Sequence, residues 1–150
     1  MIYAEETLAT AWNDVQPLAT KHWHEIAWRQ DKIQLDPDYE RYQRIEASKG
    51  LRIYTARKDS GELIGYAFWF IATLTHYKQT LCAANDVVYV DEAYRGGVGA
   101  KLLRFSETEL KKLGVQTLSL HIKEILDWSP LAAALGFERT ESTHQKWIGD

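Results

Sequence analysis

The sequence predicts an α/β fold in which one mixed β-sheet carries helices on both faces. Three observations lead to this: helical spacing of apolar residues near the start, two consecutive extended segments in the middle, and a strand, helix, strand, helix, strand order in the second half. With 150 residues, 45% of them hydrophobic, the chain can build one well-buried core. We therefore expect residues 1–150 to form a single domain.

The first segment has the apolar spacing of an amphipathic helix, at Leu8, Trp12, Val15 and Leu18. Pro17 is expected to mark a bend, because proline cannot donate the helical backbone hydrogen bond. His22–Arg29 is expected to form a further helical segment beyond it. The first 30 residues are thus predicted to be mainly helical.

The next helix is predicted to open at Asp36-Pro37. Aspartate caps free amides at a helix start, and proline suits the first helical position. One side of this helix is apolar, with Tyr39, Tyr42 and Ile45, and the pattern ends near Gly50. The opposite side is charged and is expected to face solvent.

The middle of the chain predicts a β-hairpin followed by a third strand. Leu51–Lys58 alternates apolar and polar residues, Asp59-Ser60-Gly61 is a turn signal, and Leu63–Thr73 returns. Because Leu63–Thr73 is apolar on both faces, it is expected in the middle of the sheet. Leu81–Val90 is the strand that follows.

The second half alternates helices and strands. Gly99–Leu113 has one apolar face and should end at Gly114, while Leu118–Ile122 is a short strand. A last short helix is expected to begin at Ser129-Pro130. Phe137–Ile148 is predicted to supply the closing strands.

Composition narrows the function classes. A net charge of −3 and a pI of about 6.0 provide no broad basic face for nucleic acid. The most apolar run, Ala67–Ala72, is too short to cross a bilayer, and the lone Cys82 has no internal disulfide partner, so we expect a cytoplasmic protein with no membrane partner. No metal site is expected, because His22 and His24 would point roughly 200° apart on a helix.

The stretch Asp86–Leu103, DVVYVDEAYRGGVGAKLL, passes from a strand through a basic, glycine-rich turn into a helix. Such turns let backbone amides converge at a helix N-terminus, where they hold an anion. The turn lacks the Gly-Lys-Ser/Thr ending of nucleoside triphosphate loops and the acidic ribose ligand of dinucleotide folds. The alternative is a tight connection that carries a surface arginine.

With this loop, the sequence resembles the GNAT superfamily of acyl-CoA-dependent N-acetyltransferases, whose signature is a strand, a Gln/Arg-x-x-Gly-x-Gly/Ala loop and a helix. Leu51–Lys58 and Leu63–Thr73 resemble the family's preceding hairpin, and Leu135-Gly136-Phe137 its late Leu-Gly-Phe element. Within the superfamily the sequence is most similar to phage- and prophage-encoded members of unassigned substrate. That narrower likeness is carried by His22-Trp23-His24-Glu25, Leu35-Asp36-Pro37-Asp38, Gly65-Tyr66-Ala67, His76-Tyr77-Lys78 and Tyr94-Arg95-Gly96-Gly97.

The resemblance implies the GNAT fold and acetyl-CoA as cofactor. The residues implied to hold its pyrophosphate are Arg95, Gly96, Gly97, Val98, Gly99, Ala100 and Lys101. Those implied to line the pantetheine arm with backbone groups, at a splayed sheet edge, are Val88, Tyr89 and Val90. The Val88 N–H is a candidate donor to the oxyanion. Because the loop is one residue shorter than the family pattern, we expect weaker cofactor binding than in a regular member.

The usual general acid is missing. Many GNAT members have a tyrosine four residues before the glycine of the Leu-Gly-Phe element, and here that position is Ala132. His121 and Tyr77 are candidate replacements, with a structural hydrogen bond as the alternative for each.

Two carboxylates are candidates for the general base, Asp86 on the cofactor strand and Glu25 in an aromatic helix. Trp23 and Trp28 lie near Glu25, a setting in which desolvation would raise the pKa of a carboxylate. The alternatives are that Asp86 caps a strand end and that Glu25 pairs with Arg29 at i,i+4 spacing.

The resemblance implies an N-acetyltransferase that transfers an acetyl group from acetyl-CoA to an amine. The acceptor is a small molecule, or a lysine or N-terminus of a protein, bound between the N-terminal helices and His76–Lys78. The alternative is a GNAT-fold protein that binds coenzyme A or a host partner without chemistry, which Ala132 and the short loop favour. Formation of a homodimer is left open.

Overall fold

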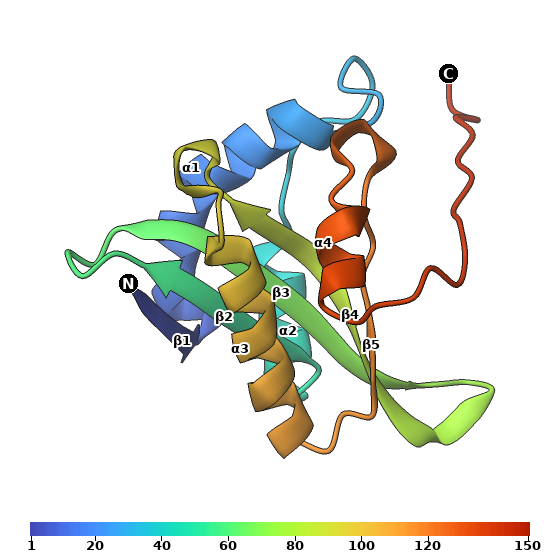
Figure 1. Ribbon diagram of the computed structural model, residues 1–150. Helices are drawn as coiled ribbons and strands as arrows, with labels where there is room; N and C mark the ends of the chain where they lie inside the picture. The colour runs from blue at the N-terminus through green and yellow to red at the C-terminus, as the bar shows by residue number, and fades with distance from the viewer.

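The computed structural model describes residues 1–150 and contains one five-stranded sheet in the order β1-β2-β3-β4-β5 (Figure 1). The strands are β1 (Ile2–Glu6), β2 (Leu51–Arg57), β3 (Leu63–Leu74), β4 (Tyr77–Val90) and β5 (Thr117–Ser119). Neighbouring strands are antiparallel except β4 and β5, which are parallel. The predicted mixed sheet is therefore confirmed.

The apolar strand β3 lies at the centre of the sheet, as predicted. Its first seven residues, Leu63–Trp69, are all buried, because both faces of the sheet are covered by helices. β2 and β3 form the predicted hairpin around a turn at Asp59 and Ser60. Beyond the sheet's covered centre, β3 and β4 continue into a second hairpin that projects from the body of the molecule (Figure 1).

Helices cover both faces of the sheet (Figure 1). The helices are α1 (Leu8–Ile26), α2 (Tyr39–Ala47), α3 (Val98–Lys112) and α4 (Ser129–Ala134), with short 3-10 turns η1 (Glu92–Tyr94) and η2 (Glu124–Leu126). α1 and α2 pack on a core that includes Leu51, Ile53 and Phe68. α3 and α4 pack on the opposite core, which includes Tyr54 and Trp69. We call these the α1/α2 face and the α3/α4 face.

α1 is one helix of 19 residues that includes Pro17, and residues 22–26 belong to it rather than to the further segment predicted at His22–Arg29. Leu8, Ala11, Val15 and Leu18 are all buried, so the apolar stripe continues across the proline. The tertiary packing of this stripe compensates for the hydrogen bond that Pro17 cannot donate. The helix ends at Ile26, before the predicted limit at Arg29.

α2 begins two residues later than the Asp36-Pro37 signal predicted. Its N-cap is Asp38, whose side chain accepts a hydrogen bond from the Arg41 N–H at 2.9 Å. Asp36 and Asp38 have the same side chain and could both cap a helix. In the helix that begins after Asp38, Tyr39 and Tyr42 pack against the core.

The closing strands predicted for Phe137–Ile148 are wrong, because no helix or strand follows α4. Most side chains in this segment are exposed, and Figure 1 shows the C-terminal tail running outside the body of the fold. The segment has few apolar side chains to bury, so nothing offsets the entropy of ordering a strand there. The sheet instead gains β1, which pairs with β2 and was not anticipated. None of the helices combines the length and apolar character needed to span a bilayer.

Candidate functional site

β4 and β5 separate from each other partway along their length. They pair only at Cys82↔Thr117, Ala83↔Leu118 and Ala84↔Ser119. Beyond Ala84, β4 has no partner strand on that edge, although its other edge stays paired with β3 as far as Val90. Val88, Tyr89 and Val90 lie in this unpartnered stretch, where the sequence placed an open strand edge. Backbone groups on such an edge can bind an extended chain that carries amides.

A β-bulge interrupts β4 at Asp86. Phe68 of β3 lies opposite Val87, and Trp69 lies opposite Asn85, so Asp86 has no partner of its own. Asp86 contacts Tyr42 of α2, and Val87 packs on the core beneath α1 and α2. Two successive residues thus face the same side of the sheet, as a bulge permits. The bulge places the Asp86 carboxylate on the α1/α2 face, beside the open edge of β4.

The Asp86 carboxylate is half-buried beside the Tyr42 hydroxyl. Burial raises its pKa above the ordinary value, although the hydrogen bond donated by the Tyr42 hydroxyl and the nearby charges of Arg41 and His121 act to lower it. Asp86 was one of the two candidate bases, although the sequence placed the desolvating setting around Glu25. Asp86 lies inside β4, so the alternative interpretation as a cap at a strand end is wrong.

The two candidate acids are far apart. His121 follows β5 with an exposed side chain, near enough to Asp86 for its charge to act on that carboxylate. Tyr77 begins β4 in the projecting hairpin and is 63% exposed. Nine residues of strand separate Tyr77 from Asp86, about 30 Å at the rise of a β-strand. The structure therefore does not bring Tyr77, or the His76–Lys78 hairpin, to the open edge of β4.

The glycine-rich turn leads into the N-terminus of α3. Gly96 and Gly97 have φ angles of 125° and 120°, and no heavy atom lies within 4 Å of where a Cβ would stand on either. Gly97 is the N-cap, has no side chain to cap the helix, and its carbonyl accepts the first helical hydrogen bond, from Lys101 at 3.1 Å. The amides of Val98, Gly99 and Ala100 precede that bond and are free to bind an anion.

Arg95 is tied to α1 and to the end of β4. Its Nη2 donates to Glu25 Oε2 at 2.6 Å, and its Nε donates to the Val90 carbonyl at 3.1 Å. The guanidinium also lies 5.5 Å from the centre of the Tyr89 ring, whose hydroxyl donates to Glu25 Oε1 at 2.8 Å. Arg95, Glu25 and Tyr89 form a network that we call the Arg95 anchor.

Glu25 does not have the raised pKa expected of a base. Burial acts to raise the pKa, but the hydrogen bonds from Arg95 and Tyr89 outweigh it and lower the pKa below its ordinary value. Pairing with Arg29, the alternative interpretation, is also wrong, because the partner is Arg95 and the Arg29 guanidinium lies over the Trp28 ring. Glu25 is thus an ionised anchor for the glycine-rich turn.

His22 was missed by sequence reasoning as part of this network. Its ring stacks on Tyr89 with centroids 4.7 Å apart, and its Nδ1 lies 3.4 Å from the Tyr66 hydroxyl. Burial lowers its pKa to about 4, so the ring is neutral at neutral pH. The i,i+3 spacing of His22 and Glu25 on α1 was the signal that they share a face.

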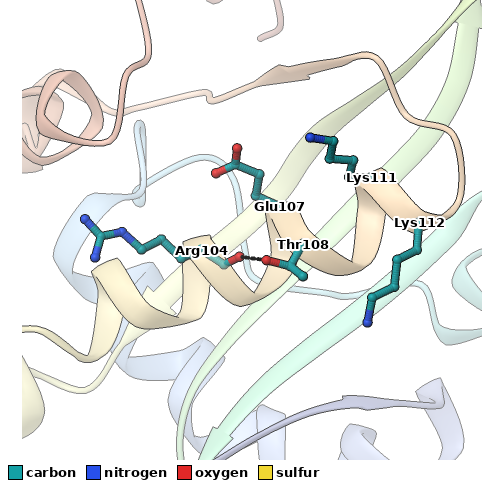
Figure 2. Close-up of a pocket in the computed structure, with 5 residues that line it drawn as sticks. All are labelled: Arg104, Glu107, Thr108, Lys111 and Lys112. Atoms are coloured by element: carbon teal, nitrogen blue, oxygen red, sulfur yellow. Dashed lines mark hydrogen bonds between the residues drawn. The ribbon is translucent and has the colours of Figure 1, made fainter.

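Two of the hollows on the surface differ in their relation to these residues. One, of about 350 Å³, adjoins the Arg95 anchor and is lined by Lys21, His24, Glu25, Tyr89, Asp91 and Glu92. The other, of about 660 Å³, lies on the outer side of α3 between Arg104, Glu107, Thr108, Lys111 and Lys112 (Figure 2). The Thr108 hydroxyl there donates to the Arg104 carbonyl at 2.9 Å. No apolar side chain lines this second hollow, and none of the candidate catalytic residues reaches it.

The chain matches the model of the acetyltransferase (GNAT) family over residues 18–137. No curated protein sequence matches it significantly. Similar solved structures include a ribosomal-protein-alanine N-acetyltransferase from Brucella melitensis biovar Abortus 2308, with 17% identity, a TM-score of 0.73, and 99% of this chain and 100% of that chain covered.

Two further structures share the fold. An aminoglycoside acetyltransferase from an uncultured soil metagenomic sample, in complex with sisomicin, has 13% identity, a TM-score of 0.77, and coverage of 99% of this chain and 96% of that chain. A predicted acetyltransferase from Clostridium acetobutylicum, with acetyl-CoA, has 15% identity, a TM-score of 0.74, and coverage of 98% and 96%. At these identities the likeness establishes the fold.

Proposed function

We propose, because this chain belongs to the acetyltransferase (GNAT) family, that it transfers an acetyl group from acetyl-CoA to an amine on a small molecule or a protein. The observation that carries the proposal is the open edge of β4, which runs directly into the free amides at the start of α3. On this one surface, backbone groups of β4 can bind amides of a ligand, and the amides at the start of α3 can bind its phosphate.

The residues present fit acetyl-CoA. Val88 and the Val90 N–H would hold the pantetheine arm, because the alternation of antiparallel pairs directs their backbone groups to the open edge, whereas the Tyr89 backbone pairs with Tyr66 of β3. The amides of Val98, Gly99 and Ala100 would hold the pyrophosphate. Positive φ angles at Gly96 and Gly97, with open space where a Cβ would stand, leave the turn free of side chains that would cover those amides. The Arg95 anchor holds this turn against α1 and β4. Lys101, exposed on the first turn of α3, adds positive charge on the same side.

Asp86 is the proposed general base. Acetyl-CoA supplies a thioester carbonyl; the amine nitrogen forms the new C–N bond, the C–S bond breaks, and its electron pair leaves with the thiolate. Asp86 takes the proton from the amine nitrogen, and its raised pKa makes it a better base than an ordinary carboxylate. The Val88 N–H is the proposed donor that would polarise the carbonyl oxygen.

The position of the usual acid contributes no proton. Ala132 is buried in α4 and has no hydroxyl. A thiolate is a fair leaving group at neutral pH, so protonation by water suffices. His121 is the nearer of the two sequence candidates and stays a proposed substitute acid, whereas Tyr77 is too distant.

The acceptor is proposed to approach from the α1/α2 face, because Asp86 faces that side. The hollow beside the Arg95 anchor carries the carboxylates of Glu25, Asp91 and Glu92, two of which are paired with cations. Glu92 has no salt-bridge partner, and together with Asp86 it favours a cationic amine over an acidic acceptor.

A second candidate function is binding of coenzyme A without turnover, and the absence of a tyrosine at Ala132 favours it. Two measurements on the purified protein separate the candidates. Calorimetric titration with acetyl-CoA, followed by mass spectrometry of polyamines and lysine peptides incubated with protein and acetyl-CoA, should give binding and an acetylated amine. Binding with no acetylated product would favour the second candidate, and no binding would contradict both.

A further inference from the structure

Asn85 is one of three polar side chains in the buried core, with 6% of its surface exposed. It lies at the point where β4 and β5 part, directly after Ala84, the last residue of β4 that pairs with β5. Its Oδ1 accepts a hydrogen bond from the His121 N–H at 2.6 Å, and its Nδ2 lies 3.5 Å from the His121 carbonyl. Both ends of one side-chain amide therefore meet the backbone of one residue.

This contact takes the place of the next backbone pairing between β4 and β5. If β5 continued in register, Leu120 and His121 would pair with Asn85 and Asp86 and would occupy the backbone groups on that edge of β4. The Asn85 side chain satisfies the His121 backbone instead, so β5 ends at Ser119 although the sequence predicted a strand as far as Ile122. Because a side-chain amide lies between the two backbones, they stand farther apart than paired strands do.

We propose that Asn85 is a positioning residue that holds β4 and β5 apart and so sets the opening for the cofactor's pantetheine arm. This inference rests on the proposed function. Without the Asn85 amide, the His121 N–H and carbonyl would lose their partner at a partly buried site and would be drawn toward β4. The edge that Val88 offers would then narrow or close.

Asn85 also immediately precedes the bulge. Asp86 has no cross-strand partner, so the direction of its carboxylate depends on how β4 is held on either side of it. The bond at 2.6 Å fixes the residue before it, and the hydrogen bond from Tyr42 fixes the carboxylate itself. Loss of Asn85 should therefore disturb both the cofactor opening and the base.

The test uses the full chain with three substitutions. Asn85→Ala removes both hydrogen bonds, and Asn85→Asp keeps an oxygen to accept from the His121 N–H. Thr55→Val is the matched control, because Thr55 is a fully buried polar residue in β2 that bonds to Glu6, away from the opening. The readouts are the calorimetric Kd for acetyl-CoA and hydrogen exchange of the His121 amide, with thermal melts to establish folding.

Asn85→Ala is expected to weaken acetyl-CoA binding about tenfold and to speed exchange at His121 by at least about tenfold, the effect of one buried hydrogen bond. Asn85→Asp should fall between wild type and Asn85→Ala in both readouts. Thr55→Val should lower the melting temperature without changing the Kd. If Asn85→Ala does not fold, Asn85→Ser takes its place in the same comparison, because its hydroxyl is too short to reach His121.

An unchanged Kd in a folded Asn85→Ala or Asn85→Ser protein, with wild type binding acetyl-CoA, would overturn the inference while leaving the proposed function intact. Absence of binding in the wild type would instead contradict the proposed function. The hydrogen-exchange readout needs no cofactor, and unchanged protection at His121 would by itself refute the role of Asn85 as a spacer.

Discussion

The two faces of the sheet differ in what they bring to the open edge of β4. The α1/α2 face contributes titratable side chains: Asp86 bonded to Tyr42, and Glu25 bonded to Arg95 and Tyr89 beside the neutral His22. The α3/α4 face contributes free backbone amides at the start of α3 and the small side chain of Ala132. In the proposed function, this difference would separate two tasks, proton transfer by side chains on one face and ligand binding by backbone groups on the other.

The largest expected effect is loss of turnover in Asp86→Asn. A general base typically contributes 10²–10⁴-fold, so we expect kcat to fall about 10²- to 10³-fold, measured as free thiol released from acetyl-CoA at pH 7. The melting temperature should not fall, because the buried carboxylate is held at a raised pKa and its charge is unfavourable there.

Glu107→Gln is the matched control for Asp86→Asn, since Glu107 is an exposed carboxylate on α3 in the hollow of Figure 2. It should leave kcat unchanged. If kcat of Asp86→Asn changes threefold or less, Asp86 is not the general base. The α1/α2 face would then lack the proton-transfer role proposed for it.

The second prediction concerns acid stability. Burial lowers the pKa of His22 from 6.5 to about 4, so between these values the unfolded chain binds more protons than the folded one. Stability therefore rises with pH across this window and is lost as pH falls through it. His22→Phe should remove up to about 2–3 kcal/mol of the difference in unfolding free energy between pH 7 and pH 4.5.

Urea titrations of wild type and His22→Phe at the two pH values provide the measurement. His144 is exposed and belongs to the tail, so His144→Phe is the control and should keep the wild-type pH dependence. If the unfolding free energy depends on pH equally in all three proteins, His22 is not held neutral by the α1/α2 face.

The third prediction separates two roles for Arg95. If Arg95 anchors the turn through Glu25 and the Val90 carbonyl, Arg95→Ala should weaken acetyl-CoA binding about tenfold, and Glu25→Gln should weaken it by a smaller factor. If Arg95 instead binds the pyrophosphate directly, Glu25→Gln would free its charge and strengthen binding. Calorimetric titration of both variants decides, and tighter binding by Glu25→Gln would contradict the anchor.

Sequence patterns predicted most of the scaffold because they record local physics. The apolar run at Leu63–Thr73 predicted the central strand, and the glycine-rich turn predicted α3 from Gly99, one residue after its start at Val98. The C-terminal strands failed because a few alternating residues in Phe137–Ile148 do not reveal whether the strand has a core to cover. Pro17 was expected to mark a bend before a further helical segment. Packing on both sides of it instead maintains one helix.

The site was less predictable because its contacts join distant residues. Asp86 was identified as a candidate base, but its partner Tyr42 lies 44 residues away, and Glu25 and Arg95 are 70 residues apart. Local spacing favoured Arg29 as the partner of Glu25, and only the fold reveals the competing guanidinium. Nothing in the sequence indicated a role for Asn85. An asparagine within a strand is informative only once the structure reveals that the neighbouring strand, β5, separates from β4 at this residue.

The smallest expected effect is a shift in the pH dependence of turnover. The Tyr42 hydroxyl stabilises the charged form of Asp86 and so lowers its pKa against the effect of burial. Tyr42→Phe should raise that pKa, so the rising limb of kcat/KM should move to higher pH, by about one unit or less. The pH profiles of kcat/KM are measured for both proteins with the same amine, so that titration of the acceptor affects them equally. A shift to lower pH in Tyr42→Phe would contradict the assignment of Asp86 as the base.

Free-thiol release from acetyl-CoA by wild-type protein, with and without an added amine, tests the central claim most directly. If Asp86 takes a proton from an amine bound beside the open edge of β4, release should depend on the amine and should reach saturation with it. Release that is absent, or equal with and without every amine in a panel of polyamines, lysine peptides and aminoglycosides, would contradict amine acetylation by this site.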